Sequence, residues 1–582
     1  MMVKTDKKTI LYSIFIFFIS FSYLTIWIWQ GIDLTDSGYN LTKQWLLFNG
    51  NIENQLDLMF GSTFIGGLWN SIISGNYLIW AFLGSVLIGS LSVLLVYTIL
   101  SNYFEKKKAF IAVVSIIPIA VVQIIKVPNY NDIPLLLFLL VIYFLIKAPL
   151  VNNKLSKVFL ISAGIIYAIL VISRFMLIVF LFFPLLLTIY NIFSKQNKIH
   201  WLKNSLLFLG GFVVGLTIIF LFLFKYGLLE NYFANLYNYF LNKASIQATS
   251  ISSETDSHSF KNILLITIEY YYYVLIFTPI TIIFLNIFSY LLVIKKNIVK
   301  DFLVILFSIF IIFFAFVYYA GIYFIIFGLN IFLILLYLYK SKNKKTNFLL
   351  LISLYSQMII NIGSNIQNWT CMYLSSALSI ILLFKLGEFE SSSYFKKVIN
   401  FINLKKFLII ILIFTGIITN FFNIYRDSSN RFELVHSFET DNLKCVFTTK
   451  DRADTIDEVI EKIKASVNKY DEVLLINSVP LLYYLTETKP ITKDPWPLNL
   501  YSTDVFKNEM EEIFSKSPPE IVVVAKGSPR MDKEWPKNVD TIGVQSRNLE
   551  KLDYLYITID KYNYKLEWEN KGFELYKKTG FR

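Results

Sequence analysis

The chain has 582 residues, of which 55% are hydrophobic, 17% aromatic and only 16% charged, and its mean hydropathy is +0.56. Since a soluble globular protein keeps about a quarter of its residues charged, the composition excludes a soluble enzyme. The net charge of +13 is concentrated in the first 426 residues, with 31 Lys and Arg against 14 Asp and Glu; residues 427–582 hold 23 against 27. Such an excess in the apolar part is a topology signal and gives no support to a nucleic-acid partner.

The first apolar segment starts near Thr9, behind the basic sequence MMVKTDKK. It has about 20 residues and lacks a small-residue cleavage site, so it predicts a retained helix rather than a secretory signal. Further apolar stretches of membrane-crossing length recur to about Tyr425. If every basic cluster between them is cytoplasmic, the chain has about thirteen spans, with its N-terminus inside. The sequence therefore predicts a polytopic α-helical protein of the cell (inner or plasma) membrane.

This topology places two larger loops outside the membrane, at residues 31–76 and 225–265. After residue 426 the pattern changes: DTIDEVIEKIKASVNKY is typical of an amphipathic helix, and DEVLLINS and EIVVVAKG are typical of short buried strands. We therefore expect a transmembrane domain over residues 1–426 and a soluble external α/β domain over residues 427–582.

The first external loop opens with GIDLTDSGYNL at residues 31–41, which places Asp33 and Asp36 next to the membrane surface. One interpretation is local: an Asp at the N-cap of a short helix in YNLTKQWLLFNG, where apolar residues recur at helical spacing. The other interpretation is catalytic, because a partly desolvated carboxylate can deprotonate an acceptor hydroxyl. A helix start does not exclude catalysis, since a capping Asp can also face a cleft.

The order of features at the start of the chain resembles that of the GT-C glycosyltransferases. A short N-terminus is followed by one helix, and then by an external loop that begins D-S-G-Y-x-L and runs into a small amphipathic helix. These membrane enzymes, similar to protein O-mannosyltransferases and aminoarabinose transferases, take sugars from polyprenyl-phosphate carriers. The resemblance extends over the spans, the two larger loops and the C-terminal domain, and it implies a GT-C-like fold.

The resemblance also implies a catalytic carboxylate in the first external loop. Asp36 holds the matching position, Asp33 is the second candidate, and Tyr39 of the same motif is expected to contact the sugar or acceptor. The chain departs from the family pattern in two places. Ser37 stands where many relatives have Glu, and QLDLMFGSTF replaces a Pro-Pro stretch later in the loop.

Arg174 is the only Arg in the first 425 residues, and it falls midway between two basic clusters. At the centre of one long helix it would be costly without a partner, so we expect the chain to turn at residues 173–175 and to present Arg174 externally. A guanidinium there suits a lipid-linked phosphate, because its fork matches phosphate oxygens and it stays charged. Related enzymes have a basic residue at a comparable apex. The alternative is an Arg that snorkels to the membrane interface.

The apex KVPNYND at residues 126–132 supplies further candidates. Lys126 is expected to help hold the donor phosphate. The other polar side chains are of kinds that bind sugar hydroxyls: Asn129, Tyr130, Asn131 and Asp132. The alternative is an ordinary Pro-Asn turn between two helices.

Two later polar segments complete the candidate residues. GSNIQNWT resembles an apex of related enzymes, so Asn365 and Gln367 are candidates for the sugar pocket. Glu254, Asp256 and His258 alternate as metal ligands on one strand face do, although Ser-rich polar loops also have this composition. No cofactor is firmly predicted, and a divalent cation stays open. Gly-rich phosphate loops, Ser-His-Asp sets and zinc motifs are not evident.

Together these features predict an inverting glycosyltransferase that moves a hexose or pentose from a polyprenyl-phosphate donor to a lipid, glycan or protein acceptor at the external face. Its expected partners are that donor, membrane lipid and the acceptor. Other classes stay open. A transporter or flippase of lipid-linked sugars would place charge or helix breaks near the bilayer midplane. A polymerase or ligase of surface glycans and a noncatalytic scaffold of the same architecture are the remaining alternatives.

Overall fold

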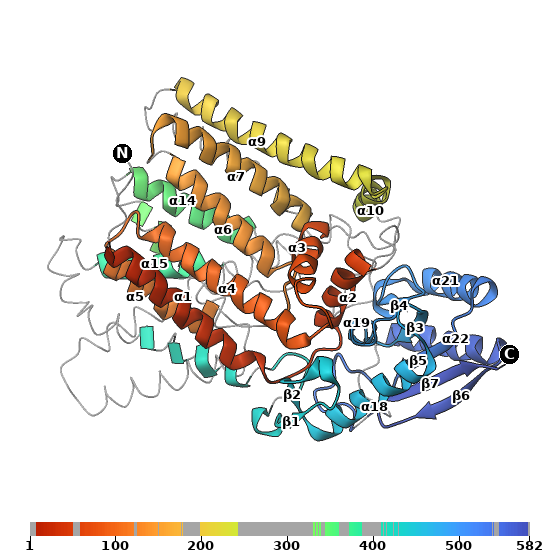
Figure 1. Ribbon diagram of the computed structural model, residues 1–582. Helices are drawn as coiled ribbons and strands as arrows, with labels where there is room; N and C mark the ends of the chain where they lie inside the picture. The colour runs from red at the N-terminus through yellow and green to blue at the C-terminus, as the bar shows by residue number, and fades with distance from the viewer. Residues whose placement is uncertain are drawn as a thin grey trace, which may run out of the picture.

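The structure is a computed structural model. It describes residues 7–49, 59–120, 125–148, 151–178 without 176, 198–241, 344–359, 372–386, 430–537, 539 and 546–579, with parts of 330–338 and 409–428. Helices of the N-terminal part run side by side as a bundle, and the C-terminal region covers one end of it (Figure 1). The start of α1 lies at the opposite end of the bundle.

Four helices of the described residues are long and apolar enough to cross a membrane: α1 (Lys7–Ile28), α4 (Leu78–Leu100), α7 (Asn153–Ser173) and Leu202–Lys225 of α9 (Lys198–Lys225). They support the predicted multi-pass membrane protein. The number of thirteen spans stays a prediction, because much of the apolar sequence, including residues 242–329, lies outside the described residues.

Helices α7 and α9 pack at very close range because glycines line their contact. A Cβ added to Gly164 would lie 2.1 Å from the Phe208 carbonyl oxygen, and one added to Gly211 would lie 2.2 Å from the Ile161 carbonyl oxygen. Small residues allow this approach of two backbones, as in other membrane helix pairs. Arg174 follows directly after the end of α7.

Shorter helices complete the N-terminal part. α2 (Asp36–Asn49) and α3 (Phe60–Asn70) lie between α1 and α4 in the sequence. α5 (Lys106–Ala120) and α6 (Asp132–Lys147) flank the KVPNYND apex, as the sequence predicted. The other described helices of this part are α10 (Leu229–Leu241), α14 (Lys344–Ile359) and α15 (Met372–Leu386).

The C-terminal region contains a five-stranded sheet of order β4-β3-β5-β7-β6. β3 (Glu472–Ile476) is parallel to β4 (Lys489–Pro490) and β5 (Ile521–Ala525), and β7 (Phe573–Lys578) is antiparallel to β5 and β6 (Tyr564–Glu569). Strands β3 and β5 are the two predicted from DEVLLINS and EIVVVAKG.

The remaining elements of this region are helices and one small strand pair. α18 (Lys450–Ser466) is the predicted amphipathic helix, and its buried face carries Ile456, Val459 and Ile463. The others are η5 (Arg431–Glu433), β1 (His436–Ser437), η6 (Asp441–Leu443), β2 (Phe447–Thr448), α19 (Leu481–Thr486), α20 (Pro497–Leu500), α21 (Thr503–Lys516) and α22 (Ser546–Lys561). A mainly helical protein with a C-terminal α/β region is therefore confirmed.

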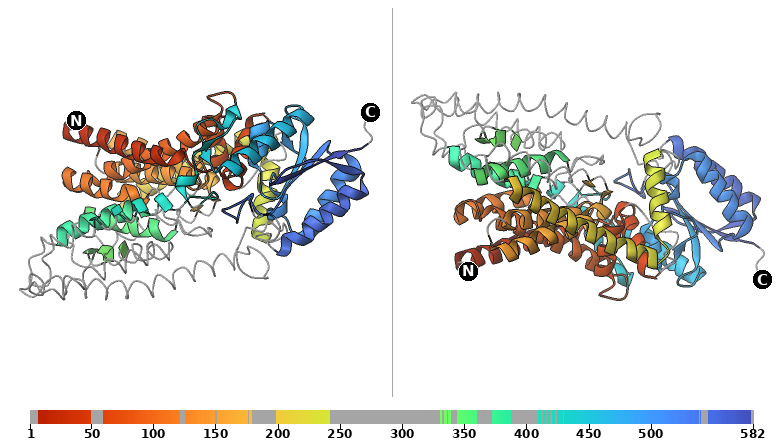
Figure 2. Two further views of the ribbon diagram at one scale, coloured as in Figure 1. Left: turned by 90° about the horizontal axis from the view of Figure 1, so that it is seen from below. Right: turned by 90° about the horizontal axis from the view of Figure 1, so that it is seen from above.

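The segment after β3 packs directly on α2, at the end of the bundle that the C-terminal region covers (Figure 2). The Leu481 amide donates to the Leu34 carbonyl at 3.1 Å, and the Thr42 hydroxyl donates to the Pro480 carbonyl at 2.7 Å. A Cβ added to Gly38 would lie 2.3 Å from the Leu481 nitrogen. The carboxyl end of β3 therefore lies against the loop that carries both predicted catalytic carboxylates.

Candidate active site

Asp33 holds the start of α2. Its Oδ1 accepts from the Thr35 amide at 2.9 Å and from the Thr35 hydroxyl at 2.6 Å, and its Oδ2 accepts from the Ser37 amide at 2.6 Å. Burial, and then the charge of Asp36, raise the pKa of the Asp33 carboxyl. The local interpretation of this loop, an Asp that satisfies the exposed amides of a helix start, therefore describes Asp33.

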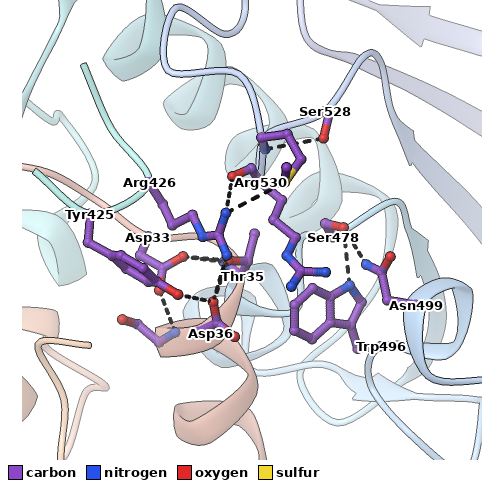
Figure 3. Close-up of polar contacts among 12 residues, drawn as sticks. Asp33, Thr35, Asp36, Tyr425, Arg426, Ser478, Trp496, Asn499, Ser528 and Arg530 are labelled. Carbon is purple, nitrogen blue, oxygen red and sulfur yellow. Dashed lines mark hydrogen bonds and ion pairs between the residues drawn. The ribbon is translucent and has the colours of Figure 1, made fainter. Parts of the chain in front are cut away.

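Asp36 is the first residue of α2, and its carboxylate is held on one side only (Figure 3). Oδ2 accepts from the Tyr425 hydroxyl at 2.5 Å, and it lies 3.5 Å from Arg426 Nη2 and from the Thr35 hydroxyl. Within the described part of the chain, each side-chain contact of this carboxylate uses Oδ2. Tyr425 and Arg426 therefore anchor one oxygen of the Asp36 carboxylate.

Tyr425 and Arg426 lie where the apolar part of the sequence ends, and the sequence interpretation assigned them no role. Arg426 has a left-handed backbone, with φ of +59°, which is uncommon for a residue other than glycine. Its Nη1 donates to the Arg530 carbonyl at 2.6 Å. A Tyr-Arg-Asp sequence directly behind an apolar run is the signal that could have identified this segment, because charged residues there lie beside the first loop.

Arg530 and Trp496 of the C-terminal region lie near Arg426 and Asp36 (Figure 3). The Arg530 guanidinium lies 5.1 Å from the centre of the Trp496 ring, in a cation–π contact. The Trp496 indole donates to the Ser478 hydroxyl at 3.1 Å, and the Asn499 amide donates to the same oxygen at 2.6 Å. These residues follow strands β3, β4 and β5, and the sequence interpretation had found no site residues in this region.

Tyr39, one turn after Asp36 in α2, contacts the C-terminal region. Its hydroxyl donates to Asp494 Oδ2 at 3.2 Å, and its ring centre lies 6.0 Å from that of Trp496. Lys43, one turn further along α2, forms an ion pair with Asp494 at 3.3 Å. The structure therefore shows Tyr39 in a contact between α2 and the C-terminal region.

Lys126 of the KVPNYND apex contacts the first external loop, and Asn129 and Asp132 of the same apex contact each other. Lys126 Nζ donates to the carbonyls of Gln30 and Gly31, and burial lowers the pKa of Lys126 to about 7. Asn129 Oδ1 accepts from the Asn131 amide at 2.8 Å and its Nδ2 donates to Asp132 Oδ2 at 2.8 Å, which shapes the turn into α6. The contacts of Asn129 fit the turn interpretation of the apex.

Arg174 approaches the apex from α7. The helix ends at Ser173, and Arg174 has an extended backbone with φ of −157°, so the chain leaves the helix where the sequence predicted a turn. Its side chain is buried and Nη1 donates to Asn131 Oδ1 at 3.4 Å. Burial and the negative charge of Asp36 raise the pKa of Tyr130, whereas Arg174 and Arg530 oppose that rise. Tyr130 therefore lies within electrostatic reach of Asp36 and of both guanidinium groups.

Other predicted candidates lie outside the described residues: Asn365, Gln367, Glu254, Asp256 and His258. In the part of the chain that is described, no group of three or more His, Cys, Asp and Glu side chains could hold a metal ion. The sequence left a divalent cation open without predicting one, and that question stays open.

Comparison with known proteins gives one family match. Residues 63–224 match the family described as Dolichyl-phosphate-mannose-protein mannosyltransferase. The chain is also similar to the solved apo form of the Archaeoglobus fulgidus oligosaccharyltransferase, with 12% identity, a TM-score of 0.44, and coverage of 99% of this chain and 75% of that chain. No curated protein matches the chain.

The family match confirms the resemblance to the GT-C glycosyltransferases that the first loop predicted. It includes the apex with Lys126 and the turn at Arg174, and it begins after Asp36. The apolar helices and this match over residues 63–224 support a membrane glycosyltransferase of GT-C type.

Proposed function

We propose that the protein transfers one sugar from a polyprenyl-phosphate donor to a lipid, glycan or protein acceptor at the external face of the membrane, with Asp36 as the base. The observation that carries this proposal is the one-sided anchoring of Asp36. Tyr425 and Arg426 orient the carboxylate through Oδ2, and Oδ1 is left to accept the proton of an acceptor hydroxyl.

In the proposed reaction the acceptor oxygen forms a bond to the anomeric carbon as its proton moves to Asp36 Oδ1. The bond from that carbon to the donor phosphate breaks, and the electron pair leaves with the phosphate. Direct attack of this kind inverts the anomeric configuration. A fixed cation stabilises the leaving phosphate more in the transition state than in the ground state, because negative charge develops there.

Arg174 is the better placed of the two predicted phosphate ligands. Its guanidinium lies at the turn after α7 and acts electrostatically on the same tyrosine, Tyr130, as Asp36. The Lys126 ammonium, in contrast, donates to backbone carbonyls of the first loop. Arg426 is unsuited to the leaving group in this reaction, because it contacts the base, and direct displacement places base and leaving group on opposite sides of the anomeric carbon.

Asp33 is a poor candidate for the base, since both of its oxygens accept hydrogen bonds from the start of α2. The proposal is tested by transfer from radiolabelled polyprenyl-phosphate sugars, with purified wild-type protein and three variants. Asp36→Asn is expected to lower kcat by about 100-fold or more, whereas Asp33→Asn retains most activity. Arg174→Ala is expected to lower transfer as well. Undiminished transfer by Asp36→Asn would remove the proposed base.

A further inference from the structure

The loop between α1 and α2 is held by main-chain bonds from the C-terminal region. The Gly31 amide donates to the Phe447 carbonyl at 2.8 Å, and the Phe447 amide donates to the Trp29 carbonyl at 2.7 Å. Strand β2 thereby pairs with the loop directly in front of Asp33 and Asp36.

Asp427 forms the next contact along the same loop. Its Oδ2 accepts from the Ile32 amide at 2.8 Å and from the Thr448 hydroxyl at 2.7 Å, and its Oδ1 pairs with Arg452 Nη1 at 2.8 Å. The side chains of Asp427 and Arg452 are 0% and 2% exposed. A carboxylate buried this completely needs a fixed cation and several donors, and the C-terminal region supplies two of them.

Arg452 belongs to α18 and also contacts the residue that anchors Asp36. Its Nη1 donates to the Arg426 carbonyl at 2.9 Å, and its Nε donates to the Trp535 carbonyl at 3.0 Å. The hydrogen bond from Arg452 to the Arg426 carbonyl thus holds a residue whose backbone is left-handed. An Arg is suited to this place because its planar fork donates in several fixed directions, which a Lys does not reproduce.

We infer that Arg452 and Asp427 are positioning residues for the reaction at Asp36. Two routes lead from the pair to the base: Asp427 fixes the Ile32 amide of the loop, and Arg452 fixes the backbone of Arg426, whose side chain contacts Asp36. The C-terminal region thus sets the geometry of a carboxylate in the membrane part of the chain. The catalytic role of Asp36 in this inference rests on the proposed function; the mechanical coupling does not.

The coupling is tested by amide hydrogen exchange of the full purified chain, read on peptides covering residues 29–38. Arg452→Lys keeps the charge and loses the fork, so exchange of the Ile32 and Ser37 amides is expected to quicken by about 10-fold or more. The double variant Arg452→Met, Asp427→Asn removes both charges together, which avoids leaving one buried charge unpaired, and it is expected to show a larger effect.

Val459→Ala is the matched control, because it removes buried apolar volume two turns further along the same helix. It is expected to lower the unfolding temperature without quickening exchange in residues 29–38. If the Arg452 variants exchange like wild type there, or if Val459→Ala quickens exchange equally, the coupling is wrong.

Kinetics add a readout that lowered stability does not produce. With a radiolabelled polyprenyl-phosphate sugar that supports transfer, Arg452→Lys is expected to lower kcat by about 10- to 100-fold, since small misplacements of a base cost that much, with KM little changed. An unchanged kcat alongside faster exchange would overturn the positioning role. Absence of transfer by wild type would instead count against the proposed function and leave the exchange result standing.

Discussion

The Tyr425 hydroxyl donates to Asp36 Oδ2 at 2.5 Å, although 389 residues separate the two in the sequence. This hydrogen bond joins the end of the apolar part of the chain to the start of α2. Together with the contact from Arg426, it anchors Oδ2 of the Asp36 carboxylate. Under the proposed function, Tyr425 therefore orients the base.

Tyr425→Phe removes this hydrogen bond and retains the ring. Small misplacements of a base cost up to about 100-fold, so kcat for sugar transfer is expected to fall by about 10-fold or more. Loss of a hydrogen bond to a charged group, about 1.5–3 kcal/mol, is expected to lower the unfolding temperature as well. The matched control is Tyr556→Phe, which removes a hydroxyl bonded to Glu574 on the exposed surface of the C-terminal region. Equal activity of both variants and wild type would contradict a role for Tyr425.

Asp33→Ala tests the different role of the neighbouring carboxylate. The substitution removes three hydrogen bonds at the start of α2, and loss of a helix cap costs about 0.5–2 kcal/mol. We expect a lower unfolding temperature in detergent, with the remaining folded protein still active. Asp36→Asn should show the reverse pattern, with lost transfer and near-normal stability. A stable but inactive Asp33→Ala protein would make Asp33 the better candidate for the base.

The sequence predicted the parts of the site that depend on local pattern. The position of Asp36 beside the first helix follows from the length of one apolar run, and the turn at Arg174 follows from the cost of a charge inside a helix. The same rules mark the segment with Tyr425 and Arg426 only as the end of an apolar run, and they give no role to these residues or to Arg530. Their roles depend on contacts with residues about a hundred or several hundred positions away, which no local periodicity records.

The boundary placed after residue 426 illustrates the same limit. A change from apolar to polar composition predicts the end of a membrane segment there. In the structure Tyr425 contacts α2, and Arg426 contacts the C-terminal region. Composition reports whether residues prefer lipid or water, whereas Asp427 is buried between two parts of the protein. From sequence alone, a charged side chain next to an apolar run can therefore lie either in solvent or in a buried ion pair.

Gly38→Ala tests the contact between α2 and the C-terminal region. The added Cβ would lie 2.3 Å from the Leu481 backbone nitrogen, so the segment after β3 must move. Overpacking of this kind costs about 1–3 kcal/mol, and we expect faster amide exchange in α19. Gly210→Ala in α9 is the control, because no atom lies within 4 Å of its added Cβ. Normal exchange in α19 of Gly38→Ala would show that the contact adjusts without loss.

Lys126→Met tests how the first loop is held from the membrane part, and it predicts a pH dependence. Burial lowers the pKa of Lys126 from 10.5 to about 7 in the folded chain. Below pH 7 the folded and unfolded chains both carry the proton, so the cost of burying the charge is fully present. Between pH 7 and 10.5 the folded chain releases the proton and the unfolded chain keeps it, so the free energy of unfolding rises with pH.

The slope from this single group approaches about 1.4 kcal/mol per pH unit. We therefore expect the unfolding temperature of wild type, relative to that of Lys126→Met, to increase from pH 7 to pH 9. Lys154→Met, at an exposed position near the start of α7, is the control and should follow wild type at every pH. If the unfolding temperatures of wild type and Lys126→Met change with pH in the same way, the Lys126 ammonium keeps its proton while bonded to the two carbonyls. Lys126 would then remain a fixed cation at neutral pH.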